Sequence, residues 1–193
     1  MDNVESIFSK DLKGQTGSLL ISDFLEGHKV IILGKSNVAK RSNSFESFGG
    51  RYEKEDATTL HTAVRETIEE FFNLKPSNNK VNEIAEGFRK NKLIIRQYEL
   101  HGMSYLINFS GLNFIFQKLL SDFTELKPYD DKSKFNVTKY IEERQVPDKP
   151  TEGLNEIHSL RVFKINDIKE KKIDIDIRWY TNKLISKLLF RGG

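Results

Sequence analysis

One segment constrains the fold of this chain more than any other: residues 48–74, which read FGGRYEKEDATTLHTAVRETIEEFFNL. A glycine pair, Gly49 and Gly50, allows the backbone to bend sharply near its start. No glycine or proline interrupts residues 57–71, which predicts a helix over that range with Asp56 as its N-cap. The segment therefore predicts a bend that leads directly into one helix.

Three carboxylates lie on one side of the predicted helix. Glu66 and Glu70 are four residues apart, and Glu69 follows Glu66 by three, so all three reach the same side. Like charges at this spacing repel, and a divalent cation among them would offset the repulsion. Oxygen ligands of this kind suit Mg²⁺ or Mn²⁺. The charge pattern taken alone is more typical of a solvated helix face, and the residues before the helix decide between the two interpretations.

The segments on either side carry strand and helix patterns in turn. Strands are predicted over 18–24 and 29–35 as a hairpin, over 92–100 and 103–110 as a pair, and over 154–165. Helices are predicted over 81–88, 112–123, 135–144 and 177–190. This order predicts an α+β fold in which helices pack against a mixed sheet.

Composition limits the class of protein. A length of 193 residues, of which 37% are hydrophobic, is typical of one domain with a substantial core. The chain has no cysteine, which excludes disulfides and thiolate metal sites. No apolar stretch approaches the roughly 18 residues that span a membrane, and the N-terminal residues lack the signal-peptide pattern, so we expect a cytoplasmic protein without a membrane partner. The net charge of +3 permits an anionic ligand.

The segment resembles the Nudix box. That box has a glycine, five residues, an acid, seven residues, Arg-Glu, an aliphatic residue, any residue, two glutamates, any residue, a glycine and an aliphatic residue. The chain matches it at Gly50, Asp56 (an aspartate for the usual glutamate), Arg65, Glu66, Glu69 and Glu70. Eight residues, one more than in the box, separate Asp56 from Arg65. Thr67 stands at the aliphatic position and Phe72 at that of the last glycine.

This resemblance implies a Nudix-like mixed β-sheet sandwiched between helices, with an extra helical insertion. It implies a single domain over 18–193, preceded by a lead-in over 1–17 and carrying the insertion at about 112–153. The implied activity is Mg²⁺- or Mn²⁺-dependent hydrolysis of the pyrophosphate in a nucleoside diphosphate linked to another moiety. A metal ion suits that reaction because it neutralises charge on the phosphate oxygens and activates water.

The resemblance also assigns roles to the matched residues. The implied metal ligands are Gly49 through its carbonyl, Glu66, Glu69 and Glu70, and the implied structural residues of the box are Gly50, Asp56 and Arg65. Glu66 or Glu69 would also position the attacking water as a catalytic residue. A further acid is expected on a late loop or strand, and Glu156 is the candidate, with Glu152 behind it. The pair at 142–143 is an alternative that a solvated helix face explains better.

Substrate-binding residues are expected outside the box. Phe48 and Tyr52, with Phe45, are candidates for stacking on a base, although the abundance of Phe favours core positions for two of the three. Lys35 and Arg41 follow the second predicted strand, where a substrate can pass, or belong to a solvated loop. The last predicted helix carries a basic face at Arg178, Lys183, Lys187 and Arg191, which suits either an RNA backbone or solvent.

Three functions remain open from the sequence. The Phe after the glutamates and the content of Lys, Asn and Ile resemble Nudix proteins of large DNA viruses, some of which remove the cap from messenger RNA in the host cytoplasm. The first interpretation is therefore a decapping hydrolase with capped RNA as its partner. The second is the same chemistry on a small nucleotide, such as a dinucleoside polyphosphate, ADP-ribose or a nucleoside triphosphate. The third is a binding module of this fold without catalysis.

Overall fold

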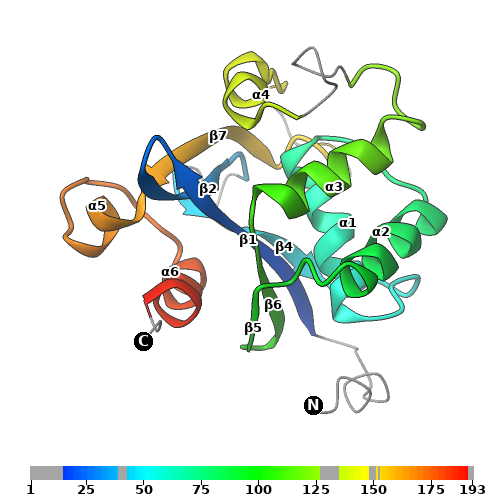
Figure 1. Cartoon of the computed structure of the whole chain (residues 1–193), viewed down its shortest axis with the longest axis horizontal. Coiled ribbons are helices and arrows are strands. Elements are labelled where there is room, and N and C mark those ends of the chain that lie inside the picture. The colour runs from blue at the N-terminus through cyan, green and yellow to red at the C-terminus, as the bar shows by residue number, and fades with distance from the viewer. Residues whose placement is uncertain (1–14, 39–42, 127–134, 148–150, 152, 191–193) are drawn as a thin grey trace.

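The computed structural model describes residues 15–38, 43–126, 135–147, 151 and 153–190 (Figure 1). Its strands are β1 (Thr16–Leu25), β2 (His28–Ser36), β3 (Phe45–Glu46), β4 (Phe48–Arg51), β5 (Arg96–Glu99), β6 (Gly102–Ile107) and β7 (Ile157–Lys164). Its helices are α1 (Thr59–Phe71), α2 (Asn78–Lys90), α3 (Phe109–Leu119), α4 (Val137–Glu143), α5 (Ile165–Lys169) and α6 (Trp179–Ile185), which continues as the π-helix η3 (Ser186–Phe190).

The strands form one mixed sheet with β1 at its centre. β1 pairs antiparallel with β2 and β4 and parallel with β6. The main path of the sheet is β3-β2-β1-β6-β5, and β7 also pairs with β2. The pairing of β1 with β4 places Gly49 beside Ser18 and Gly50 beside Gly17. The predicted α+β fold with a mixed sheet is confirmed.

Helices cover both faces of this sheet. Successive side chains of a strand point to opposite faces. In β1, Leu19 and Ile21 belong to a hydrophobic cluster shared with α1, α2 and α3, whereas Leu20 belongs to a second cluster shared with α6 and η3. Figure 1 shows α1, α2 and α3 on one side of β1 and β2, with α5 and α6 on the other. The sheet therefore lies between two helical layers, as predicted.

A close approach to β1 fixes the position of α1. A Cβ atom added to Gly17 would lie 2.1 Å from the carbonyl oxygen of Thr59, in the first turn of α1. Only glycine leaves room for the helix at this distance, since real Cβ atoms do not approach a carbonyl oxygen so closely. This contact, together with the packing of α1 on β4, holds the later residues of α1 above the glycine pair.

Most predicted elements are present with shifted ends, and the larger differences are as follows. The glycine-containing stretch before α1, predicted as a bend, forms the short strands β3 and β4, because its backbone pairs with β2 and β1. Asp56 is not the N-cap of α1: the cap is Thr58, whose Oγ1 accepts a hydrogen bond from the His61 N–H. The last helix begins at Trp179 rather than residue 177, and the short helix α5 was not predicted. In the described part of the chain, no helix has the length and apolarity needed to cross a bilayer.

Candidate functional site

A cavity of about 650 Å³ opens where α1 faces β4. Its first wall consists of carboxylates and glycines: Glu46, Gly49, Gly50, Glu66, Glu69, Glu70 and Glu156. Its second wall comes from the start of α6, with Arg178, Trp179, Tyr180 and Thr181. The cavity therefore combines a strongly acidic side with a basic and aromatic side.

The glycine pair makes room for the carboxylates of α1. The Gly49 N–H donates a hydrogen bond to Glu70 Oε2 at 2.9 Å. A Cβ atom on Gly50 would lie 2.3 Å from Glu66 Oε1, and one on Gly49 would lie 2.3 Å from the Cβ atom of Ser18. Any side chain at these two positions would displace Glu66 or push β4 away from β1. The glycine pair therefore has a steric cause.

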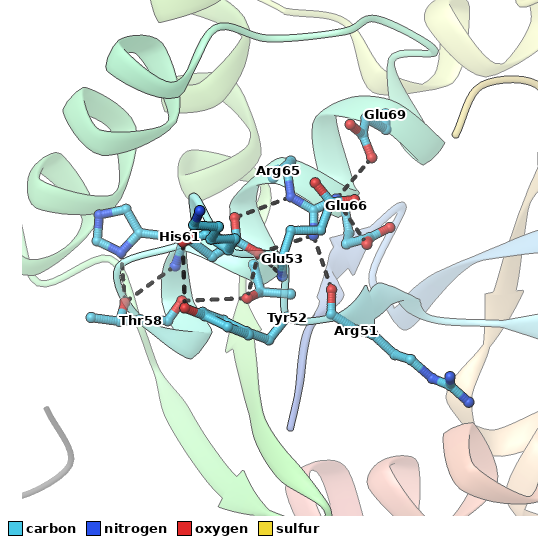
Figure 2. A network of polar contacts seen from close by, with 11 residues as sticks. Arg51, Tyr52, Glu53, Thr58, His61, Arg65, Glu66 and Glu69 are labelled. Atoms are coloured by element: carbon cyan, nitrogen blue, oxygen red, sulfur yellow. Dashed lines mark hydrogen bonds and ion pairs between the residues drawn. The ribbon is translucent and has the colours of Figure 1, made fainter. Parts of the chain in front are cut away.

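Arg65 links the loop before α1 to the carboxylates on it (Figure 2). Its Nε and Nη2 atoms donate to the two oxygens of Asp56 at 3.1 and 3.0 Å, and Nη2 also donates to the Arg51 carbonyl at 3.0 Å. Its Nη1 atom donates to Glu66 Oε1 at 2.9 Å and to Glu69 Oε2 at 3.1 Å. Burial works against the charge of Arg65, but the hydrogen bond to Asp56 and the nearby glutamate charges outweigh burial and raise its pKa.

The carboxylates of α1 carry more negative charge than Arg65 can balance. Burial raises the pKa of Glu66 to about 7, and the charge of Glu69 adds to this shift while Arg65 opposes it. Burial also raises the pKa of Glu69 to about 7, with Arg65 again opposing and Glu53 adding. Burial, followed by the charge of Glu66, raises the pKa of Glu70 well above its usual range. Another positive charge at this wall would stabilise the ionised forms.

The departures from the box are accommodated locally. Although eight residues rather than seven separate Asp56 from Arg65, the Asp56 carboxylate still accepts from the guanidinium, at 3.1 Å from Nε. The buried hydroxyl of Thr67 donates to the Ala63 carbonyl at 2.7 Å, so a polar group at an aliphatic position is satisfied within the helix. Phe72 is 4% exposed and packs in the core rather than facing the cavity.

The left-handed turn that a glycine would make after α1 is made by Asn73. Its φ is 54°, a conformation that asparagine adopts more readily than other residues with side chains. The Asn73 side chain forms two hydrogen bonds with Asn155, accepting from its backbone N–H at 2.8 Å and donating to its Oδ1 at 2.9 Å. The Asn37 N–H donates to the carbonyl of Glu156 at 2.7 Å. These contacts hold the backbone of Glu156 next to the end of α1.

A half-buried arginine, Arg144, supports the same helix end. Arg144 Nη2 donates to the carbonyl oxygens of Glu70 at 2.8 Å and Ile157 at 3.1 Å, and Nε donates to Phe71 O at 3.1 Å. Burial lowers the pKa of Arg144. The last carbonyls of a helix have no partner inside it, and a cation near them is favourable. No sequence pattern signalled this role, because Arg144 lies about 70 residues from the helix end it contacts.

The donors fit a hard divalent cation by their chemistry. Carboxylate and carbonyl oxygens are the ligands of Mg²⁺ and Mn²⁺, and Gly50 leaves space for the Glu66 carboxylate that a Cβ atom would fill. Within the described part of the chain, no three acidic or histidine side chains are already arranged around a single ion position. Arg65 lies between Glu66 and Glu69, so a cation would compete with its guanidinium for these two side chains.

Two of the three candidate stacking residues are core residues, as the abundance of Phe favoured, so the assignment of Phe48 to substrate binding is wrong. Phe48 is fully buried and packs edge-on against Phe71 with ring centroids 5.4 Å apart, because its side chain points from β4 into the core under α1. Phe45 is also a core residue, in edge contact with Phe163. Tyr52 is half-buried and donates to the Lys54 carbonyl at 3.5 Å, and it is not among the described residues that line the cavity.

Of the predicted basic residues, Arg178 lines the cavity and Lys35 does not. Lys35 lies in β2 between Phe45 of β3 and Ser159 of β7, away from the residues that line the cavity in the described structure. Arg41 and Glu152 lie outside the described residues. The acidic pair of α4 at 142–143 is exposed and also stands apart from the lining residues.

Sequence reasoning missed the aromatic part of the second wall. Trp179 is 63% exposed, and its ring meets that of Tyr180 at right angles with centroids 6.0 Å apart. The Tyr180 hydroxyl donates to the Leu100 carbonyl at 3.1 Å, which fixes this corner of α6. Arg178 forms an ion pair with Glu46 at 3.0 Å. The one available signal was the single tryptophan at the polar start of a predicted helix, where core packing does not require it.

Comparisons with known proteins give no family assignment. Neither the protein-family models nor the curated proteins match the chain. Among solved structures, the NUDIX domain of Shewanella oneidensis NrtR complexed with ADP ribose is 9% identical, with 98% of this chain and 94% of that chain covered at a TM-score of 0.45. A mutT/nudix family protein from Listeria innocua is 12% identical over 94% of each chain at a TM-score of 0.41. A C. elegans Ap4A hydrolase is 13% identical, with 81% and 83% covered at 0.38.

Proposed function

We propose that this chain is a Nudix-type pyrophosphohydrolase that uses Mg²⁺ or Mn²⁺ to cleave the pyrophosphate of a nucleoside diphosphate linked to another moiety. The supporting observation is the set of three buried or half-buried carboxylates, Glu66, Glu69 and Glu70, which one helix presents to a cavity beside the glycine pair. A purely structural acidic face would be solvated rather than lining a cavity with raised pKa values. The sequence resemblance to the Nudix box adds the expected order of these residues.

The proposed reaction is attack of water on one phosphorus of the pyrophosphate. The water proton passes to a carboxylate, for which Glu66, Glu69 and Glu156 are the candidates in the cavity, and the bond from phosphorus to the bridging oxygen breaks. Glu66, Glu69, Glu70 and the Gly49 carbonyl would hold the metal ion, which supplies positive charge to the phosphate oxygens when bound.

Arg65 has a positioning role in this proposal. Through its bonds to Asp56 and the Arg51 carbonyl, it holds the loop before α1 against the helix that carries the acids. Its Nη1 atom keeps Glu66 and Glu69 turned toward the same side. The hydrogen bonds between Asn73 and Asn155, and the bond from the Asn37 N–H to the Glu156 carbonyl, keep the loop of Glu156 at the rim of the cavity on its acidic side.

We propose capped RNA as the substrate, with the cap pyrophosphate in the carboxylate cavity. The exposed basic side chains of the C-terminal helix, among them Lys183, support a polyanionic substrate. The second candidate is a free small nucleotide, which the cavity volume of about 650 Å³ favours because it is typical of small-ligand sites.

The test is a product assay in Mg²⁺ with the wild-type chain, Glu69→Gln and the control Glu142→Gln. Glu142 is exposed on α4 and does not line the cavity, so its variant should retain wild-type rates. Each protein is given capped RNA and a panel of dinucleoside polyphosphates, ADP-ribose and nucleoside triphosphates. We expect the wild type and Glu142→Gln to release a methylated guanosine diphosphate from capped RNA. In Glu69→Gln the rate of release should be at least about 100-fold lower.

Other outcomes of this assay assign the other interpretations. Turnover of small nucleotides but not of capped RNA would replace decapping by small-nucleotide hydrolysis. Absence of turnover on every substrate, in folded wild-type protein with Mg²⁺ or Mn²⁺, would contradict the hydrolase proposal and leave a binding module. Equal rates in Glu69→Gln and wild type would contradict the assignment of the site.

A further inference from the structure

A second groove lies behind the aromatic wall of the first cavity. It has a volume of about 1060 Å³ and is formed by α5, residues 171–177, and α6 with η3. Five lysines line it, at positions Lys169, Lys171, Lys172, Lys183 and Lys187, against two acids, Asp174 and Asp176. Its charge is therefore opposite to that of the carboxylate cavity.

Trp179 is the residue that the two spaces share. It lines both the carboxylate cavity and the lysine groove, and it is one of three large hydrophobic side chains that are exposed in the described structure. Its neighbour Tyr180 is anchored through its hydroxyl, which forms hydrogen bonds with the Leu100 carbonyl and the Ser104 hydroxyl. The ring of Trp179 therefore stands on a fixed corner of α6. An exposed, supported aromatic ring between two polar cavities is a stacking platform for a base.

Two lysines of the groove are available for phosphate contacts. Lys171 and Lys183 are exposed, and no ion pair involves either of them among the described residues. Lys172 pairs with its neighbour Glu170 on the surface. A single-stranded polynucleotide needs both backbone cations and aromatic rings, and the groove has both within one continuous surface.

We propose that Trp179 stacks on a base of a single-stranded polynucleotide, and that the lysine groove binds the phosphates of the nucleotides that follow. This inference rests on the proposed hydrolase function in one respect: the hydrolase places the terminal pyrophosphate of the polynucleotide in the carboxylate cavity. The acidic wall repels further phosphates, so a polyanionic chain passes over Trp179 and continues into the basic groove. The substrate class is then a polynucleotide with a terminal pyrophosphate linkage, in preference to a free mononucleotide.

Intrinsic fluorescence tests the inference directly, because Trp179 is the only tryptophan of the chain. The wild-type protein is titrated, with EDTA present to prevent turnover, with single-stranded hexanucleotides of RNA and of DNA, with a mononucleotide, and with polyglutamate. Saturable quenching by a hexanucleotide, at an affinity at least about 10-fold above that of the mononucleotide, is expected. The hexanucleotide that binds with the lower affinity, RNA or DNA, identifies the sugar that the site disfavours.

Two results of this titration would overturn the inference. Absence of quenching by both hexanucleotides means that no base stacks on Trp179. Equal affinity for hexanucleotide and mononucleotide, or equal quenching by polyglutamate, means that the groove does not read a polynucleotide. Each result is independent of catalysis, since no turnover takes place in EDTA.

Matched variants separate stacking from charge. The double variant Lys171→Gln/Lys183→Gln removes two groove cations, and Lys90→Gln/Lys92→Gln removes two exposed lysines near the end of α2, on the other helical layer. Lys171 and Lys92 also share a φ of 53°, so the two double variants perturb similar backbone. The plot of log affinity against log salt has a negative slope, and the groove variant should make that slope less steep by about 1.4, at about 0.7 per lost phosphate contact. The α2 variant should leave the slope unchanged, and equal slopes in the two variants would refute the groove.

The stacking arm uses anisotropy of a labelled hexanucleotide, because the fluorescence reporter is lost in Trp179→Ala. That variant should bind about 5- to 100-fold more weakly, whereas Phe24→Ala should bind as the wild type does. Phe24 is 66% exposed, close to the 63% of Trp179, and lines neither cavity. The Glu69→Gln variant should bind the hexanucleotide normally even though it is expected to be inactive, so loss of turnover and loss of binding remain distinguishable.

Discussion

The two walls of the cavity differ in how the chain builds them. Apart from Glu156, the acidic wall comes from β3, β4 and α1, within about 25 residues of sequence, and its charged groups are buried or half-buried. Arg65 donates hydrogen bonds to Glu66 and Glu69 within this wall. The aromatic wall comes from the start of α6, more than 100 residues later, and its leading side chain is exposed. The acidic wall is therefore part of the fold's stability, whereas the Trp179 ring of the aromatic wall adds a surface that the fold does not depend on.

Replacing Arg65 should have the largest effect on stability. In Arg65→Ala the buried Asp56 loses its only cationic partner among the described contacts, and Glu66 and Glu69 lose theirs. The free energy of unfolding should fall by about 3–5 kcal/mol, since breaking a buried ion pair leaves uncompensated charge. Urea denaturation followed by circular dichroism measures this loss.

Arg161→Ala is the control for that measurement. Arg161 is exposed on β7 and contacts only the face of the Phe163 ring among the contacts described, so its loss should cost less than about 1 kcal/mol. A loss in Arg65→Ala as small as in this control would show that the acidic wall is no more coupled to folding than the surface is.

The difference between the walls also explains what the sequence predicted. The acidic wall depends on helical spacing and on the glycine pair, which are local, so Glu66, Glu69, Glu70 and Gly50 were found together from the sequence alone. The order of strands and helices likewise follows from periodicity. Local patterns predict local geometry, and both of these features are local.

What the sequence could not give depends on tertiary contacts. In the sequence, Phe48 is an aromatic residue beside the glycine pair, as a stacking residue would be. Its side chain points into the core because it belongs to β4, and β4 forms only because it pairs with β1. Trp179 reaches the cavity only because α6 packs on the far face of the sheet. Arg144 supports the end of α1 from another distant segment. No spacing within the sequence encodes such meetings.

Metal and pH should act on the acidic wall with opposite signs. The folded pKa values of Glu66 and Glu69 are about 7, above the ordinary carboxyl value of 4.5, so the folded state binds more protons than the unfolded state between these pH values. Without metal, the free energy of unfolding should therefore fall as pH rises from about 4.5 to about 7. A divalent cation replaces the lost protons.

Thermal unfolding with and without Mg²⁺ at two pH values checks this expectation. At pH 8, Mg²⁺ at about 100 times its dissociation constant should add about 2.7 kcal/mol to the free energy of unfolding. At pH 5.5 the gain should be much smaller, because protons compete for the same carboxylates. The Glu69→Gln variant should lose part of the gain at pH 8. An equal gain at both pH values would contradict metal binding at this wall.

The rim at Glu156 should show an intermediate effect. In Asn73→Gly the backbone can still adopt a positive φ, but the two hydrogen bonds to Asn155 are lost. The expected loss in the free energy of unfolding is about 1 kcal/mol, and turnover should fall if these bonds hold the loop of Glu156 in place. The control is Asn43→Gly, because Asn43 also has a positive φ and is not among the residues that line the cavity. Asn82 would not serve, since it lies inside α2. Equal turnover in Asn73→Gly and Asn43→Gly would remove the rim from the catalytic arrangement.

Trp179→Ala should have the smallest effect on stability. The side chain is 63% exposed at the first residue of α6, so its removal leaves no cavity and should change the free energy of unfolding by less than about 0.5 kcal/mol. Polynucleotide binding should nevertheless weaken, because the ring is the surface that the cavity and the lysine groove share. Urea denaturation and anisotropy on the same preparation compare the two quantities. A variant that is strongly destabilised would show that the aromatic wall, like the acidic one, belongs to the core of the fold, and the contrast between the walls would be lost.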